Sequence, residues 1–281
     1  MIKITADSTA DLGDCFLERN IGIFPLSVIL GDDTFDDGFD VTPDKIYDFV
    51  AKTGKLPKTA AKGVEDYKEF FEKLTADGSS VIHFDISKEL SSSNEHAAAA
   101  AAQMKNVYVI DSKSLSTGTG LLAMYAADLR DEGKLSAKEI YEKCLARVDK
   151  VQTSFVVDTM EYLYKGGRCS GLASFFAGAL KIKPSLILRD GKITVGPKYM
   201  GNMVKSITKY CENIIESYPH ADKTRVFVTH TSADEKVVEA AKAVVREKIG
   251  PVEIIETVAG SVVTSHCGKG TLGILYINDA E

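Results

Sequence analysis

Arg168 is the residue of this sequence best suited to bind an anion. It follows Gly166 and Gly167, whose conformational freedom permits a sharp turn that aims the arginine at a fixed point. The fork of a guanidinium can bond both oxygens of a carboxylate or a phosphate. Two interpretations remain open at this point: Arg168 binds an anionic ligand, or it forms a salt bridge with a nearby acid such as Glu161.

Hydroxyl groups form a second set of candidates. Thr59 lies in a loop between two helical patterns, and the serines at 91–93 come directly before an alanine-rich helix. Serine at the start of a helix usually caps it, but hydroxyls and free helix N–H groups also bind anions. From the local sequence alone, helix capping is the better explanation for the serines at 91–93. The same holds for Ser8 or Thr9 after the first strand.

Patterns for nucleotides, metals and nucleophiles are weak. The run 268–273, GKGTLG, has the spacing of a dinucleotide fingerprint, but a strand follows it instead of a helix. The run 33–38 resembles a calcium loop in part, although Phe35 takes a ligand position. His266 beside Cys267 suggests a thiol nucleophile, but adjacent side chains usually point apart. We therefore expect no metal and no cofactor.

Composition and charge narrow the class of protein. The chain has 281 residues, which is long enough for two domains, and its net charge of −6 argues against a nucleic-acid partner. No apolar run reaches the roughly 20 residues of a transmembrane helix, and the start lacks the apolar stretch of a signal peptide. Five scattered cysteines indicate free thiols in a reducing cytoplasm.

Strand and helix patterns alternate through the first half of the chain, which predicts a parallel sheet covered by helices on both faces. One helix should begin at Thr42 as N-cap and Pro43 as its first residue. In the second half, Asp190-Gly191 predicts a two-residue hairpin turn and, with the crossovers, a mixed sheet. We predict an α/β protein with a parallel-sheet α/β/α domain over 1–150 and a mixed-sheet α/β domain over 151–281.

Taken in order, several motifs resemble those of the DegV family of bacterial fatty-acid-binding proteins, also called FakB. They are DSTADL, the K-T loop, I-S-x-x-L-S, IDS-x-S-x-x-T-G-x-G, E-Y-L-x-K-G-G-R, KIKP and H-x-G-x-G, between Ile2 and about Tyr276. The resemblance implies two α/β domains and one long-chain fatty acid in an apolar tunnel that starts near the domain junction. It implies that the carboxylate is held by Thr59, Ser91, Arg168 and His266, the last two directly or through water.

The resemblance also implies a binding protein without catalysis of its own. It presents the lipid to a separate fatty acid kinase, which phosphorylates the carboxylate, and it is expected to be a monomer. The chain departs from the family in its loops, which read KTAAK, LSSS and HCGKG, so Ser92 could replace Ser91 as a donor. An arginine often found after the hairpin is missing from KYMGNM.

Two other functions stay open. The altered loops allow a carrier of another apolar ligand with a different partner. An acyl hydrolase or transferase would use a serine or Cys267 with His266, but the sequence has no G-x-S-x-G elbow. Candidate tunnel walls flank the glycine turn: Phe155, Met160, Leu163, Phe175, Phe176, Leu180 and Ile182.

Overall fold

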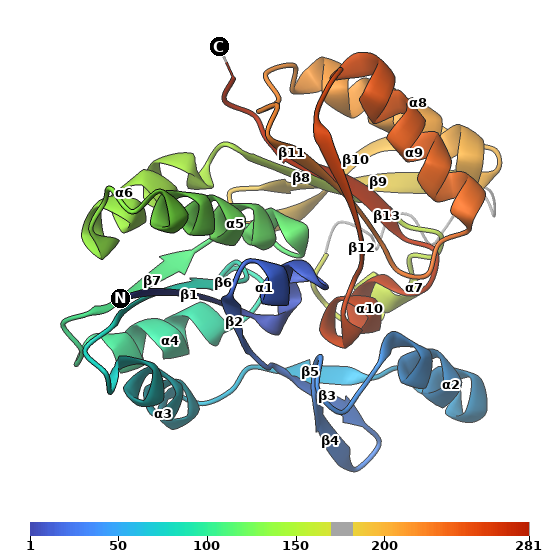
Figure 1. Ribbon diagram of the computed structural model, residues 1–281. Helices are drawn as coiled ribbons and strands as arrows, with labels where there is room; N and C mark the ends of the chain where they lie inside the picture. Colours follow the sequence, from blue (N-terminus) through green and yellow to red (C-terminus); the bar gives the residue numbers. More distant parts are fainter. Residues whose placement is uncertain (170–181, 281) are drawn as a thin grey trace.

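A parallel four-stranded sheet, in the order β2-β1-β6-β7, forms the first half of the protein (Figure 1). The computed structural model describes residues 1–169 and 182–280. Helices α3 and α4 cover one face of this sheet and α5 and α6 the other, as the alternating pattern predicts. The elements are β1 (Ile2–Asp7), η1 (Ser8–Ala10), α1 (Cys15–Glu18), β2 (Ile21–Phe24), α3 (Val64–Thr75), β6 (Ser80–Asp85), α4 (Ser93–Ala101), β7 (Val107–Asp111), α5 (Thr117–Glu132) and α6 (Ala137–Val148).

A small antiparallel sheet, β4-β3-β5, lies beside the first one. The run FPLSVIL looks like one strand in the sequence, but it divides at Pro25, which has no N–H to donate to a ladder. The part before Pro25 ends β2, and the part after it forms β3, which pairs antiparallel with β4. Thr42 caps the helix that starts at Pro43, as predicted. The elements are β3 (Ser27–Leu30), β4 (Asp33–Asp36), α2 (Pro43–Thr53) and β5 (Lys58–Ala60).

A mixed six-stranded sheet, in the order β10-β9-β8-β13-β11-β12, forms the second half. The predicted hairpin joins β9 to β10, and its turn residues Asp190 and Gly191 have φ angles of 50° and 79°. The elements are β8 (Val151–Val156), α7 (Glu161–Lys165), β9 (Ile182–Arg189), β10 (Lys192–Met200), α8 (Met203–Ser217), β11 (Arg225–His230), α9 (Glu235–Lys248), β12 (Glu253–Val258), α10 (Ser261–Cys267) and β13 (Leu272–Ile277).

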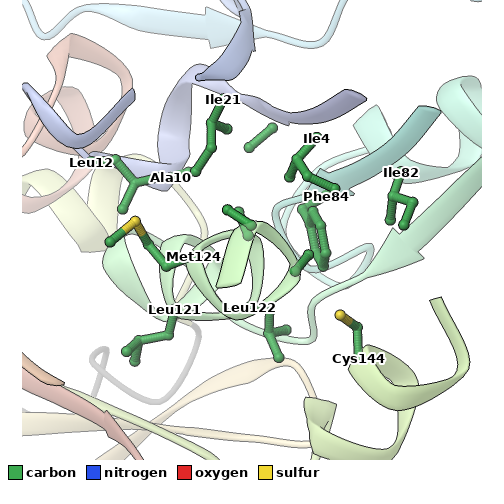
Figure 2. Packing of buried hydrophobic residues seen from close by; sticks show 14 of the residues in the cluster. Ile4, Ala10, Leu12, Ile21, Ile82, Phe84, Leu121, Leu122, Met124 and Cys144 are labelled. Atoms are coloured by element: carbon green, nitrogen blue, oxygen red, sulfur yellow. The ribbon is translucent and has the colours of Figure 1, made fainter. Parts of the chain in front are cut away.

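Helix α5 is packed between the two large sheets, because it contacts β1 and β6 on one side and β8 and β13 on the other (Figure 1). From Thr117 to Ala127 it is buried except for the half-buried Tyr125, whereas its last turn is polar and more exposed. Leu121, Leu122 and Met124 join Ile4 and Phe84 of the parallel sheet in one core cluster (Figure 2). Phe227, Leu275 and Ile277 of the mixed sheet belong to the same cluster. The two halves therefore share a continuous apolar core.

The boundary that we predict near residue 150 stays a prediction, although β8, the first strand of the mixed sheet, begins at Val151. Within residues 1–169 and 182–280, no helix is both long and apolar enough to cross a membrane.

Candidate functional site

One cavity of about 60 Å³ brings together Thr59, Ser91, Arg168 and His266, which lie far apart in the sequence. An apolar wall with a few polar groups gathered on it suits a ligand that has a polar head and an apolar body. That the four polar residues bind such a head stays a prediction. The other described lining residues are mostly apolar: Leu26, Ala60, Ala61, Ile86, Leu90, Leu115, Leu163, Ile193, Val262, Val263 and Cys267.

Thr59 and His266 meet across the cavity although 207 positions separate them, with 2.7 Å between Thr59 Oγ1 and His266 Nε2. The sequence places Thr59 in a loop, but the structure has it on strand β5, opposite Val28 of β3. His266 lies on α10, a helix that the sequence pattern does not predict. Both side chains therefore stand on regular elements, which fixes their positions better than loops would.

The start of α10 is anchored by two buried carboxylates from the first half of the chain. Asp11 accepts a hydrogen bond from the N–H of Gly260, and Asp37 accepts one from the N–H of Ser261, each at 2.7 Å. Carboxylates are favoured at a helix N-terminus because its N–H groups are unpaired and its dipole is positive there. Burial nevertheless raises the pKa of both carboxyls. These contacts hold the helix that carries His266 against the N-terminal half.

The His266 ring is neutral in this environment. Burial and the nearby Arg168 guanidinium lower its pKa from 6.5 to about 4. Its Nδ1 is shielded from solvent and has no hydrogen-bond partner among the described residues. A Cβ at Gly166 would lie 2.6 Å from this Nδ1, so only glycine permits such a close approach. Gly166 thus makes room for His266, while Gly167, with a φ of 72°, makes the turn before Arg168.

We expect His266 to stay neutral in the ligand-free protein until the pH falls to about 4. Because its folded pKa lies below its ordinary value of 6.5, its contribution to stability is present above pH 6.5 and is lost as the pH falls through 4. A shift of this size corresponds to about 3 kcal/mol. NMR titration of the imidazole would measure the pKa directly, and a midpoint near the ordinary value would contradict the prediction.

A measurement of the unfolding free energy against pH would also report the His266 shift, but it needs a matched control. The pKa shift of Asp7 changes the stability with pH in the opposite direction. Burial and the neighbouring Asp85 raise the pKa of Asp7 from 3.8 to about 7. Its contribution is therefore fully present below pH 3.8 and is lost as the pH rises through 7. The difference in unfolding free energy between wild type and His266→Gln at each pH isolates the histidine.

Ser91 is the serine of the 91–93 run that lines the cavity, whereas Ser92 is exposed and is not part of the lining. Ser91 is not the N-cap of α4, which is Ser92 and makes no side-chain cap hydrogen bond, but its Oγ accepts a hydrogen bond from the N–H of Ser93, the first residue of that helix, at 3.2 Å. At the first strand, the predicted cap at Ser8 or Thr9 is wrong. Asp7 caps there by accepting from the N–H of Thr9.

Arg168 is exposed, and its Nη1 donates to the carbonyl oxygen of Gly166 at 2.7 Å. The acid proposed as its alternative partner, Glu161, pairs with Lys165 at 2.6 Å instead. The guanidinium therefore lies at the cavity with its charge on the solvent side.

Cys267 lines the cavity beside His266, but burial raises the pKa of its thiol to about 12. A thiol that keeps its proton at neutral pH is a poor nucleophile. This environment argues against the covalent chemistry considered for Cys267.

A second cavity of about 30 Å³ adjoins the first, because Leu115, Val263 and Cys267 line both. Of the predicted tunnel walls, Leu163 lines the first cavity and Phe155 the second. Met160 is in neither lining, but it packs against the apolar cluster that supplies residues to both cavities. Ile182, which starts β9, is not in either lining. The other candidate walls, Phe175, Phe176 and Leu180, lie outside the described residues, as does Ser170, which the sequence alone would allow to cap a helix after the glycine turn.

Comparison with known proteins agrees with this architecture. A family model described as "Uncharacterised protein, DegV family" matches residues 1–279. A protein of Thermotoga maritima named "Fatty acid-binding protein" is 30% identical, with 97% of this chain and 96% of that protein covered. The solved structure of a fatty-acid-binding DegV family protein from Thermus thermophilus superposes with a TM-score of 0.88 at 26% identity, covering 99% of each chain. A stearic-acid-binding protein from Eubacterium ventriosum gives a TM-score of 0.87 at 27% identity, covering 99% of this chain and 98% of that one. This chain therefore belongs to the DegV family.

Proposed function

We propose that this protein binds a long-chain fatty acid, with the carboxyl group at Thr59, Ser91, Arg168 and His266 and the tail along the apolar walls. The observation that carries the proposal is the gathering of these four polar side chains on one otherwise mainly apolar cavity. Relatives that bind fatty acids by name, and one that binds stearic acid, support the class of ligand.

The tail supplies most of the binding free energy in this proposal. Each buried methylene contributes roughly 0.8 kcal/mol, so a chain of about 16 carbons offers roughly 10 kcal/mol before the costs of ordering. Pockets that enclose a ligand of this size usually measure roughly 300 Å³ or more. The two cavities measure only about 60 and 30 Å³. A tail of this length therefore needs more room than the two cavities offer between the described residues.

The kinase partnership is the second part of the proposal. By resemblance, the bound carboxyl group is presented to a separate fatty acid kinase and is converted there into an acyl phosphate. Arg168 is exposed and lines the cavity. A carboxyl group bound next to it is therefore close to the protein surface, where a kinase can reach it. The protein itself acts as a monomeric cytoplasmic carrier without a cofactor in this proposal, and its free cysteines suit a reducing compartment.

Native mass spectrometry of freshly purified protein, compared with the denatured mass, tests the ligand. A mass difference equal to a fatty acid supports the proposal. A different apolar molecule favours the alternative of another carrier, and turnover of an acyl ester that is lost in His266→Ala favours an acyl hydrolase or transferase. The protonated Cys267 thiol already counts against the latter.

Replacing Arg168 with alanine is expected to weaken fatty-acid binding about tenfold and to reduce phosphorylation by the kinase further. Hydrogen bonds to charged groups contribute roughly 1.5–3 kcal/mol, and the exposure of this arginine places it at the lower end. Binding is measured by displacement of a fluorescent fatty acid. Arg189→Ala, on the hairpin strand β9, removes a cation away from the cavity and should change neither quantity. If Arg168→Ala binds lipid and supports phosphorylation like the wild type, the proposed role is wrong.

A further inference from the structure

The two ring nitrogens of His266 have different surroundings. Nε2 lies 2.7 Å from the hydroxyl oxygen of Thr59. Nδ1 is shielded from solvent and has no hydrogen-bond partner within residues 1–169 and 182–280. A neutral imidazole carries one proton on its nitrogens, so one nitrogen donates and the other accepts. The position of this proton decides which of the two side chains can donate to a ligand in the cavity.

Gly166 faces Nδ1 with a carbon atom and not with a polar group. A Cβ at this glycine would lie 2.6 Å from Nδ1, so the Cα hydrogen in its place points toward the nitrogen. The Gly166 N–H donates to the carbonyl oxygen of Tyr162 at 2.8 Å, and its own carbonyl oxygen accepts from Arg168. An N–H at Nδ1 would therefore meet a C–H and be a buried donor without an acceptor, which is unfavourable. A lone pair at Nδ1 makes a weak attractive contact with the same C–H.

The Thr59 oxygen, in contrast, is an acceptor for a proton on Nε2. A hydroxyl has two lone pairs and one proton. We infer, on the basis of the proposed function, that His266 donates from Nε2 to the Thr59 oxygen and that Thr59 donates its own proton to the ligand carboxylate. His266 is then a positioning residue that acts through Thr59. This differs from the expectation that the family resemblance gives, in which His266 itself holds the carboxylate, directly or through water.

The Thr59 hydroxyl is free to take this role. Among the described residues, His266 is its one hydrogen-bond partner, so its proton has no protein acceptor once Nε2 donates to its oxygen. Thr59 and His266 both line the cavity. A carboxylate only accepts hydrogen bonds, so it matches a hydroxyl that has a proton to give.

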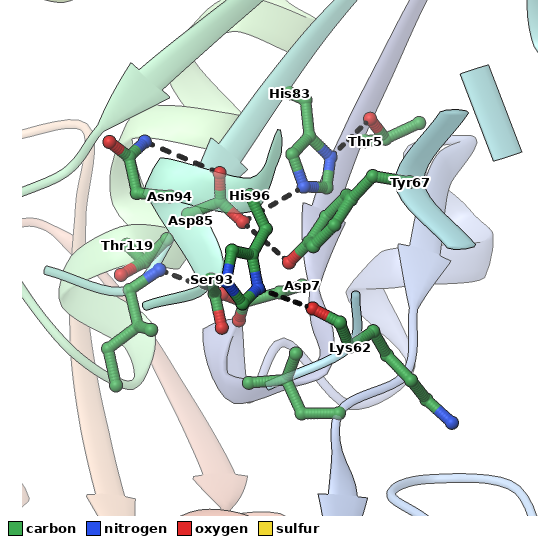
Figure 3. A network of polar contacts seen from close by, with 12 residues as sticks. Thr5, Asp7, Lys62, Tyr67, His83, Asp85, Ser93, Asn94, His96 and Thr119 are labelled. Atoms are coloured by element: carbon green, nitrogen blue, oxygen red, sulfur yellow. Dashed lines mark hydrogen bonds and ion pairs between the residues drawn. The ribbon is translucent and has the colours of Figure 1, made fainter. Parts of the chain in front are cut away.

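The position of the proton is tested by a ¹⁵N NMR spectrum of the histidine rings in delipidated wild-type protein at about pH 8, where an ordinary imidazole is neutral. Protonated and unprotonated ring nitrogens resonate far apart, and the His266 signals are those lost in His266→Gln. We expect the proton on Nε2. His96 is the internal control, because its Nδ1 lies 2.7 Å from the carbonyl oxygen of Lys62, which only accepts (Figure 3). His96 should therefore show the opposite tautomer.

The contact with the ligand is tested by a double-mutant cycle, in which palmitic acid displaces a fluorescent fatty acid. Thr59→Val replaces the hydroxyl with a methyl group and should weaken binding at least about tenfold. His266→Leu leaves the Thr59 hydroxyl free to rotate among its staggered positions, so binding should weaken about threefold. In the Thr59→Val background the same change should cost less than about twofold. A direct contact between His266 and the carboxylate would instead cost about tenfold in either background.

Conservative variants distinguish this role from a purely structural one. His266→Gln keeps a side-chain N–H donor, so it should bind palmitic acid more tightly than His266→Leu when Thr59 is present and equally in the Thr59→Val background. Replacing the exposed His220, which is not part of the lining, with glutamine should change nothing. The NMR measurement uses the wild-type protein, so it does not depend on the folding of any variant.

The outcomes separate this inference from the proposed function. If the wild-type protein binds no palmitic acid, the proposed function fails, whatever the position of the proton. If palmitic acid binds but His266 carries its proton on Nδ1, the inference alone is overturned. A tenfold loss for His266→Leu in the Thr59→Val background also overturns it, because the histidine would then contact the ligand itself. The same holds if His266→Leu has no effect in the wild-type background.

Discussion

A Val263→Phe variant is expected to bind a 16-carbon fatty acid at least about 100-fold more weakly than the wild-type protein. Val263 lines both cavities, together with Leu115 and Cys267. If the tail of the proposed ligand runs from the first cavity into the second, a phenyl ring at this position blocks its path and excludes the end of the tail. Excluding about four methylenes costs roughly 3 kcal/mol, which is the expected loss.

Chain length distinguishes a blocked passage from general damage. An acid of about 10 carbons has a tail that leaves the second cavity unused, so its affinity should fall by less than about tenfold. Val244→Phe is the matched control, because Val244 is buried to a similar degree in the core beneath α9 but lines neither cavity. It should carry a similar cost of overpacking, about 1–3 kcal/mol, with little loss of lipid affinity. Equal losses for long and short acids in Val263→Phe would contradict the proposed path of the tail.

Features with a strong local signal could be predicted from the sequence. Thr42 and Pro43 mark the start of α2 because both have side chains suited to a helix N-terminus. Asp190 and Gly191 mark the hairpin because both tolerate a positive φ. The alternation of strands and helices in the first half is enough to indicate the parallel sheet.

Features that depend on distant contacts could not be predicted in this way. Helix α10 is short and rich in β-branched residues, which are weak helix formers. Its start is stabilised by Asp11 and Asp37, which lie 249 and 224 positions from their partners Gly260 and Ser261. The strand that carries Thr59 likewise exists through its pairing with β3. No local pattern contains this information.

The four residues of the candidate site came from resemblance to a family, because local signals pointed elsewhere. Capping is the better local explanation for Ser91, but the N-cap of α4 is Ser92, whose side chain makes no capping hydrogen bond, and Ser91 lines the cavity. One buried polar contact, between His83 and Asp85, has a signal in the sequence (Figure 3). His83 and Asp85 are two positions apart in one strand, so their side chains share a face and can interact.

Asp11→Ala is expected to lower the unfolding free energy by about 2–4 kcal/mol and to weaken fatty-acid binding as well. Asp11 accepts hydrogen bonds from the N–H of Gly260 at 2.7 Å and from the hydroxyl of Ser116 at 2.6 Å. Each buried donor that loses its acceptor costs about 1–3 kcal/mol. Part of this cost is offset, because the variant no longer buries a carboxyl group whose pKa is raised by burial.

The pH dependence of Asp11→Asn separates the hydrogen bonds from the charge. The folded pKa of Asp11 lies well above 3.8, so its contribution to stability is complete below pH 3.8 and declines as the pH rises towards the folded pKa. Asparagine keeps one oxygen acceptor and does not ionise, so the deficit of Asp11→Asn relative to wild type should shrink between about pH 5 and pH 7. Urea unfolding at both pH values measures it, and Asp14→Ala, an exposed acid three residues away, is the control.

Fatty-acid binding by Asp11→Ala and Asp11→Asn tests whether the contact between Asp11 and the start of α10 also keeps the cavity residues in place. If Asp11 positions α10, its loss must move His266 relative to Thr59 and weaken binding even at temperatures where the variant is fully folded. A variant that is destabilised but binds with unchanged affinity would show that α10 keeps its place without Asp11. In that case Asp37, which bonds the next N–H of the helix, would be sufficient to hold His266 at the cavity.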